Sequence, residues 1–178
     1  FDVLYKIYEE QGYNPSEIPE LIITMNLFGI DIDDRASQMA AFSLMMKARE
    51  HQKRFLKKGV KPNITSFQNI ENHPKFKNAK VLGSLIKCNR NEYDEIKTDN
   101  ESLFGQQQEQ MKKQADYLSR SFDIVVTNPP YLNSSYMDIE LKKYINKEFS
   151  SAKSDLFAAF ILQNKRLAKE DGFIGYIC

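Results

Sequence analysis

The segment 122–131 constrains the fold of this chain more than any other. Its first six residues, FDIVVT, are dense in β-branched apolar side chains, which is typical of a buried parallel strand. Pro129 and Pro130 then remove two backbone donors and fix two φ angles, so the strand must end there. The sequence therefore predicts a rigid loop at the carboxyl end of a strand, where open α/β sheets bind ligands.

The residues of this loop are Asn128, Pro129, Pro130 and Tyr131. The Asn128 side chain and the Pro129 carbonyl are two hydrogen-bond acceptors, and Tyr131 adds a flat aromatic surface. Such a set suits a planar group that carries an exocyclic amine. The same letters also fit an ordinary turn in which Tyr131 covers a core.

A second strand is expected within residues 26–34, and a long helix follows it over residues 35–49. The strand ends in acidic residues, and a carboxylate at such a position can accept both hydroxyls of a ribose. We favour this role for Asp31, and helix capping for Asp33 and Asp34. The helix has a broad apolar face, made by Met39, Phe42, Leu44, Met45 and Met46.

These segments resemble the amino-group methyltransferases that use S-adenosylmethionine, in which the loop sequence Asn-Pro-Pro-Tyr is characteristic. Within that class the chain is similar to the adenine-specific DNA methyltransferases of phage-exclusion (BREX) systems, of the PglX type. The resemblance is carried by residues 26–50, by the short KVLGSLIK at 80–87 and by DIVVTNPPYLNSSYM at 123–137. Their order and spacing fit the family.

The resemblance implies a Rossmann-like methyltransferase fold, which is an α/β fold with a doubly wound, mostly parallel sheet. It implies that Asp31 binds the ribose of S-adenosylmethionine, that Ile32 contacts the cofactor adenine and that Asn128 also faces the cofactor.

The expected third strand, residues 63–68, departs from the family pattern. Many relatives carry an Asp at its end that binds the adenine amine, and here Ser66 or Gln68 must replace it. Phe67 either packs on the adenine ring or belongs to the core.

For catalysis the resemblance assigns Asn128, Pro129, Pro130 and Tyr131, which would hold the N6 amine of an adenine flipped out of double-stranded DNA. A helix is expected over residues 154–167, with Ser154 as its N-cap. Its Asp155 and Phe157 resemble residues that line the target-base pocket. Asp155 is equally well explained as a cap, and Phe157 as core.

Two family elements are absent, namely the first strand and its glycine-rich loop, and we expect residues 1–178 to be part of a catalytic domain. Residues 1–10 resemble the helix after that loop, and 172–178 read as a new strand. Residues 69–121 read as an insertion with helices near 81–87 and 102–118. Without the first strand, the strands 27–32 and 122–127 lose a neighbour. We expect the isolated chain to be inactive, to bind the cofactor weakly and to self-associate.

The composition indicates an ordinary soluble domain without a zinc site, and its free thiols fit a reducing cytoplasm. No apolar run approaches the roughly 20 residues that span a membrane, and Cys88 and Cys178 have no metal-ligand spacing with His51 or His73. The net charge is only +1, so any DNA affinity must be local. Two basic clusters are candidates, and the second follows the catalytic loop and is better placed: Lys47, Arg49, Lys53, Arg54, Lys57, Lys58 and Lys61, and then Lys142, Lys143, Lys147 and Lys153.

Alternative functions remain open at this point. The same loop occurs in methyltransferases that act on a protein glutamine amide or on ribosomal RNA amines, and the long insertion argues against those compact enzymes. A non-catalytic DNA-recognition module could use the same fold, but it would not need an intact Asn-Pro-Pro-Tyr. Other proteins of the defence system are candidate partners.

Overall fold

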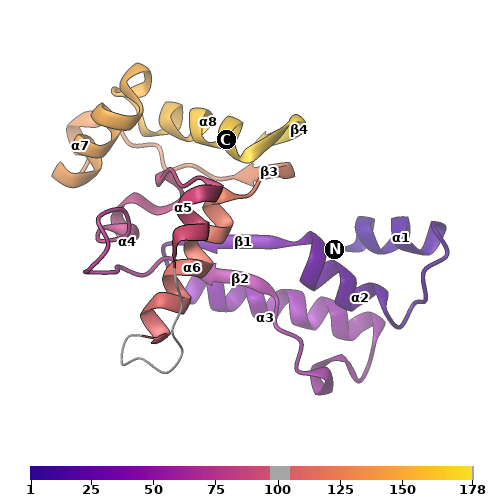
Figure 1. Cartoon of the computed structure of the whole chain (residues 1–178). Helices are drawn as coiled ribbons and strands as arrows, with labels where there is room; N and C mark the ends of the chain where they lie inside the picture. Colours follow the sequence, from indigo (N-terminus) through magenta and orange to yellow (C-terminus); the bar gives the residue numbers. More distant parts are fainter. Residues whose placement is uncertain (97–104, 178) are drawn as a thin grey trace. The chain divides into compact units, whose positions relative to one another are not determined.

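The computed structural model describes residues 1–96 and 105–177, which form a mixed α/β structure (Figure 1). The chain divides into two compact units, residues 1–67 and 68–178. Both contain a pair of parallel strands. Among the described residues, no helix combines the length and apolar character required to cross a membrane.

The first unit is built around strand β1 and the long helix that follows it. Strands β1 and β2 pair in parallel, from Phe28 opposite Asn63 to Asp31 opposite Ser66. The Ser37 hydroxyl of the helix donates a hydrogen bond of 3.0 Å to the Thr65 carbonyl, which ties the helix to the pair. In chain order the elements are α1 (Asp2–Glu10), α2 (Ile18–Leu21), a π-helical turn (Ile22–Asn26), β1 (Phe28–Asp31), α3 (Asp34–His51), a 3-10 turn (Phe55–Lys58) and β2 (Asn63–Ser66).

Helix α3 confirms the predicted helix and its cap. Asp33 is the N-cap, and its carboxylate accepts N–H groups of the first turn. Leu44 and Met45 pack on a core cluster of Ile23, Ala48 and Phe55. Met39 and Phe42 are 64% and 61% exposed, so the apolar face of the helix is covered only in part. The first unit provides no apolar partner for that side of the helix.

The second unit contains the predicted strand at residues 122–127 and the Asn-Pro-Pro-Tyr loop that follows it. Strands β3 and β4 pair in parallel, from Phe122 opposite Ala168 to Thr127 opposite Tyr176, with a register shift near Asp123. The elements are α4 (Ala79–Leu82), a 3-10 turn (Gly83–Leu85), α5 (Arg90–Glu95), α6 (Gly105–Ser119), β3 (Phe122–Thr127), 3-10 turns at Ser134–Tyr136 and Ser150–Ala152, α7 (Ile139–Glu148), α8 (Leu156–Leu167) and β4 (Ala168–Tyr176).

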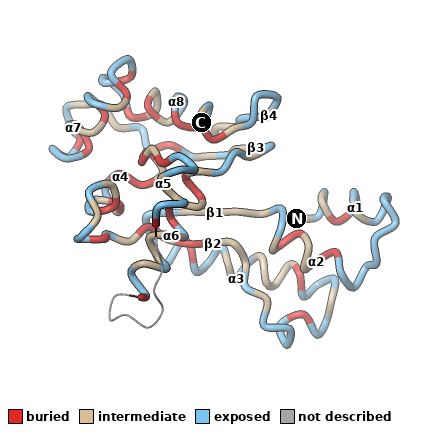
Figure 2. Tube along the Cα trace, in the orientation of Figure 1, coloured by how far each residue is buried: buried red, intermediate tan, exposed pale blue. Residues whose placement is uncertain are grey.

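The core of the second unit lies among its helices rather than over its strands (Figure 2). Fully buried apolar side chains come from the segment 76–86 and from α6 and α7, and the largest are Phe76, Leu85, Ile86, Leu118 and Ile145. On β3, in contrast, Ile124 and Val126 are each 65% exposed.

Most expected elements of the second unit are present. The helix expected near 81–87 is a shorter α4 followed by a 3-10 turn, and the helix expected at 102–118 is α6, of which residues 102–104 lie outside the described part. The last strand begins at Ala168 rather than Gly172, and its final expected residue, Cys178, also lies outside that part. The described strands form two separate parallel pairs, so a doubly wound sheet is not observed as such.

Candidate catalytic site

The loop Asn128–Pro129–Pro130–Tyr131 leaves the carboxyl end of β3, as the sequence predicts. Asn128 and Tyr131 are exposed, whereas Pro129 between them is buried. The Tyr131 ring is 68% exposed, so it does not cover a core. The amide side chain and the aromatic ring are thus both accessible at one strand end, on a backbone that two prolines make rigid.

The chain just after this loop is tied to the start of helix α8. The Leu156 N–H donates to the Leu132 carbonyl at 3.1 Å, and the Ser134 N–H donates to the Ser154 carbonyl at 3.1 Å. Asn133 and Asp155 form an isolated antiparallel bridge between the same two segments. These backbone contacts fix the loop relative to the first turn of α8.

Three aromatic rings gather beside the loop. Tyr131 and Phe157 lie nearly parallel, with ring centroids 6.0 Å apart and an interplanar angle of 10°. Phe157 also contacts Tyr176, at 5.6 Å and 49°. The Tyr131 hydroxyl donates to the Ile177 carbonyl at 3.3 Å, which orients its ring. The structure therefore brings together Phe157 and Tyr131, two residues that the resemblance assigns to the substrate.

Tyr176 is a residue of this site that the sequence reasoning did not identify. It ends β4 opposite Thr127, directly beside the strand that leads into the loop. Its hydroxyl oxygen is buried and has no hydrogen-bond partner in the described part of the chain. An aromatic residue at the end of the last apolar run was the available signal, because parallel strands end at the same edge of a sheet.

Asp155 is the N-cap of α8, and Ser154 is not, which corrects the expected cap. The Asp155 carboxylate accepts the Phe157 N–H at 2.8 Å and so satisfies a free donor of the first turn. An Asp can cap as well as a Ser, and the backbone bridge to Asn133 places it at that position. Asp155 remains exposed beside the aromatic rings.

The candidate cofactor residues of the first unit lie at the end of β1. Asp31 is exposed, and its Oδ1 accepts the Asp33 N–H at 2.8 Å. Its second oxygen, Oδ2, has no partner in the described part of the chain, which leaves it open to an external donor. Ile32 follows it and is 50% exposed.

The three candidate residues at the end of β2 differ in their burial and in their hydrogen bonds. Phe67 is only 1% exposed, so its ring lies in the core, the second of the two roles considered for it. Its N–H donates to the Asp31 carbonyl at 2.8 Å and extends the pairing of β1 and β2. Ser66 is half-buried, and the Gln68 N–H donates to the Gln114 side chain.

Helix α8 is anchored at its other end by a buried polar network. The Arg166 guanidinium donates to the carbonyls of Cys88 and Leu118, each at 2.9 Å, and to the Gln163 side chain at 3.1 Å. Gln163 itself is fully buried and donates to the carbonyls of Ser84 and Ile86. The predicted insertion is thereby attached to the helix that carries Asp155 and Phe157.

The two basic clusters differ in how far acidic neighbours neutralise them. In the first, Lys47 pairs with Asp2 and Glu50, and Lys58 pairs with Glu20. The remaining cations are exposed and form no ion pair within residues 1–96 and 105–177, namely Arg49, Lys53, Arg54, Lys57 and Lys61. In the second cluster Lys143 and Lys147 pair with Glu140 and Glu148.

The described residues include no group of His, Cys, Asp and Glu that could hold a metal ion.

Comparison with known proteins places this geometry in a family. Residues 25–178 match the Eco57I restriction-modification methylase family, so the chain belongs to it. The match includes both strand ends described above.

Three curated relatives refine this membership. The adenine-specific methyltransferase BrxX of Escherichia coli O9:H4 (strain HS) is 34% identical over 97% of this chain and 19% of its own length. The adenine-specific methyltransferase PglX of Lacticaseibacillus casei (strain Zhang) is 32% identical over 99% of this chain and 18% of its own. The type II methyltransferase M.BstVI of Geobacillus stearothermophilus is 37% identical over 32% of this chain and 10% of its own length. The chain thus spans about a fifth of the first two relatives.

Proposed function

We propose that the protein containing this chain transfers a methyl group from S-adenosylmethionine to the N6 amine of adenine in DNA. The observation that carries the proposal is the exposed Asn128 at the end of β3, near the Tyr131–Phe157 stack. The carbonyl of the next residue, Pro129, is the second acceptor of the proposal. The family match and the adenine-specific relatives favour this reaction over transfer to a glutamine amide or to ribosomal RNA.

The chemistry of the amine explains why two acceptors are needed. The lone pair of an adenine N6 amine is delocalised into the ring, so the amine is a poor nucleophile. Hydrogen bonds from its two N–H groups to the Asn128 side-chain oxygen and the Pro129 carbonyl favour a pyramidal nitrogen with a localised lone pair. The positive charge that develops on nitrogen is then stabilised by preorganised dipoles. The rigid proline backbone keeps the Pro129 acceptor in place during the reaction.

The target base must leave the duplex to reach these acceptors. Tyr131 would stack on the flipped adenine, a contact worth about 1–3 kcal/mol per base. Phe157 supports the Tyr131 ring from a nearly parallel position, and Asp155 lies at the same rim. Exposed cations of both basic clusters that form no ion pair within the described residues are candidates for contacts with the DNA backbone, among them Arg49 and Lys53 of the first cluster and Lys142 and Lys153 of the second.

Residues at the end of β1 fit the proposed cofactor, which supplies an electrophilic methyl group when it is bound. The open oxygen of Asp31 can accept a ribose hydroxyl, and exposed Ile32 offers an apolar surface to an adenine ring. Ser66, at the end of the neighbouring strand, is the candidate replacement for the Asp found in many relatives.

At the level of the whole protein, we propose a Rossmann-like, doubly wound sheet that contains both parallel pairs. We also propose a role in self-marking within a phage-exclusion or restriction-modification system, in the cytoplasm and together with other defence proteins. The match to a restriction-modification methylase family supports the restriction-modification part of this proposal.

The test is transfer of labelled methyl from S-adenosylmethionine to DNA by the full-length protein, with N6-methyladenine identified after nuclease digestion. Tyr131→Ala should lower activity by about tenfold or more through lost stacking, whereas Tyr131→Phe should keep most of it because the ring face acts. Equal losses in both variants would instead assign the function to the hydroxyl group. Label found only in protein or in RNA would overturn the proposal.

A further inference from the structure

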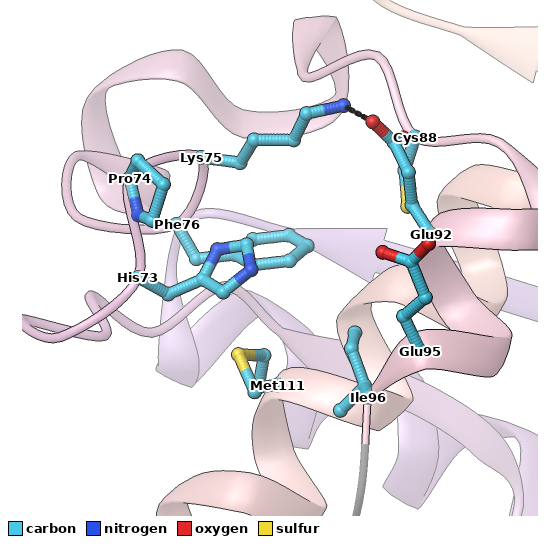
Figure 3. A pocket seen from close by; sticks show the side chains of 9 residues that line it. All are labelled: His73, Pro74, Lys75, Phe76, Cys88, Glu92, Glu95, Ile96 and Met111. Carbon is cyan, nitrogen blue, oxygen red and sulfur yellow. Dashed lines mark hydrogen bonds and ion pairs between the residues drawn. The ribbon is translucent and has the colours of Figure 1, made fainter.

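The second unit presents aromatic rings to solvent around the catalytic loop rather than in its cavity. Among the residues that line a cavity of about 390 Å³, Phe76 is only 1% exposed and the unpaired Nδ1 atom of His73 is buried (Figure 3). Tyr136, in contrast, is 80% exposed, the highest exposure of any large apolar or aromatic side chain among the described residues. It lies five residues after Tyr131 of the loop, and the proposed reaction gives it no role.

The exposure of Tyr136 is not that of a free loop, because the turn that carries it is held in place. The Tyr136 N–H donates to the Asn133 carbonyl at 2.9 Å, and the Asn133 side chain accepts the Ser135 N–H at 3.1 Å. The next residue, Met137, is buried, and Asp138 then caps helix α7. The ring is therefore displayed from a fixed backbone, so little freedom of the chain is lost when the ring binds a partner.

The same turn lies beside the residues proposed for the target base. The Ser134 N–H donates to the Ser154 carbonyl at 3.1 Å, which joins the turn to the chain just before helix α8, whose first turn carries Phe157. Five extended residues would separate the Cα atoms of Tyr131 and Tyr136 by at most about 18 Å, and the 3-10 turn shortens that separation. Two exposed tyrosine rings thus lie close together at this end of β3.

Charges around the turn nearly balance, so the ring is the main feature that it offers to a nucleic acid. Lys142 and Lys153 are exposed and can each meet a phosphate, but the exposed carboxylates of Asp138 and Asp155 offset their charge. An aromatic face, in contrast, stacks on any base that has lost a neighbour, whatever the sequence.

From these observations we infer that Tyr136 is a second stacking residue for DNA, which packs on the base next to the flipped adenine. The inference rests on the proposed function, since it requires a duplex that opens. A base inside a duplex has neighbours on both faces, so a protein ring can stack on it only where flipping has removed one of them. Tyr136 therefore stabilises the flipped state of the DNA and does not touch the reacting amine.

The first test compares two duplexes that carry the sequence methylated by the full-length wild-type protein, which sequencing of the methylated DNA identifies. At saturating DNA, Tyr136→Ala should lower the single-turnover rate on the fully paired duplex about tenfold or more, because fewer complexes hold a flipped adenine. The loss should shrink to less than about threefold when the target adenine is mispaired, since a mispaired base leaves the helix more easily. No loss on the paired duplex, or equal losses on both, would overturn the inference.

Two further variants separate the ring face from the hydroxyl and from the fold. Tyr136→Phe keeps the ring and should retain most of the wild-type rate, whereas a loss as large as that of Tyr136→Ala would overturn the stack. The matched control is Phe42→Ala, which removes an exposed ring of the first unit and should leave the rate unchanged. Thermal unfolding of Tyr136→Ala should match wild type because the ring is exposed, so a lost fold does not explain a lower rate.

The salt dependence of DNA binding gives a second measurement. Tyr136 neutralises no phosphate, so the slope of log K against log salt concentration should be the same in Tyr136→Ala and in wild type. A shallower slope in the variant would assign the effect to lost phosphate contacts and would contradict the stack.

Failure of the inference and failure of the proposed function give different results. If wild type transfers no methyl to DNA, both are wrong. If wild type methylates adenine and Tyr136→Ala does so at the wild-type rate on the paired duplex, the proposed function stands and only the role of Tyr136 is wrong.

Discussion

The two parallel strand pairs are built alike but are covered very differently. Helix α3 is hydrogen-bonded across β1–β2, and Thr65 on β2 is only 6% exposed. On β3–β4, Ile124 and Val126 are each 65% exposed and Phe173 is 73% exposed. Parallel strands normally have both faces covered. The pair that carries the Asn-Pro-Pro-Tyr loop is therefore the less protected of the two.

The strand ends differ as well. At the end of β1, one oxygen of Asp31 is already engaged with the backbone of Asp33, so the residue is held in place before any ligand binds. At the end of β3, Asn128 is exposed, and the loop around it is held by the two prolines, by the anchoring of Leu132 to Leu156 and by the contacts of Thr127 and Tyr131 with Ile177. We infer that the first end serves binding and the second serves chemistry, and the predictions below test that division.

The largest effect is expected on the rate of methyl transfer, from a change at the carboxyl end of β3. Asn128→Ala in the full-length protein should lower kcat about 10²–10³-fold, by analogy with loss of one preorganised hydrogen-bonding group. The cofactor Kd should stay within a few-fold of wild type. Single-turnover methyl transfer and equilibrium cofactor binding measure the two quantities, and an unchanged rate would remove Asn128 from the chemical step.

A slightly smaller effect is expected for the network under α8. Arg166→Met leaves the carbonyls of Cys88 and Leu118 without their donor and should destabilise the second unit by about 2–3 kcal/mol. Amide hydrogen exchange should speed up in residues 84–88 and 156–167 but not in β1 and β2.

Two controls accompany this prediction. Arg166→Lys should recover part of the protection, and exposed Lys165→Met should leave exchange unchanged. Faster exchange in β1 and β2 as well would show that the network stabilises both strand pairs.

A change at the carboxyl end of β1 should affect the affinity for the cofactor. Asp31→Ala should raise the cofactor Kd by roughly 10–100-fold, because a hydrogen bond to a charged group contributes about 1.5–3 kcal/mol. The kcat at saturating cofactor and the thermal stability should change little, since Asp31 is exposed. Calorimetric titration checks this, and unchanged affinity would leave Asp31 a purely structural residue.

The smallest effect is expected on the open face of β3. Val126→Thr should change the free energy of unfolding of the 178-residue chain by no more than about 0.5 kcal/mol. The matched change Val125→Thr, at a half-buried position of the same strand, should cost about 1 kcal/mol more. Urea denaturation compares the two. Similar costs would mean that the outer face is covered, for instance by self-association.

Local signals in the sequence were enough to predict β3, the loop and the long helix. Two prolines end a strand by covalent geometry, and an Asp before a helical pattern predicts its cap, so Thr127 and Asp33 mark observed boundaries. Helix α7 was not predicted, because its apolar residues are interspersed with charged ones, and only two of them, Leu141 and Ile145, are buried.

Long-range pairing explains the other misses. The start of β4 is polar, and it is a strand because Lys169 pairs with Asp123 at 2.7 Å and Ala168 lies opposite Phe122. Tyr176 and Arg166 gain their roles only from partners far away in the sequence. No local pattern distinguishes a half-buried arginine such as Arg166, which bonds to three segments, from an exposed one.

The bridge between Asn133 and Asp155 also has a kinetic consequence. It closes a much shorter stretch of chain than the pairing of Thr127 with Tyr176, and the entropy lost on closing a loop grows with its length. Once the bridge forms, the chain that remains to be closed between β3 and β4 is effectively shorter. We therefore expect refolding to be sequential, with the region around the prolines ordered before β3 and β4 pair.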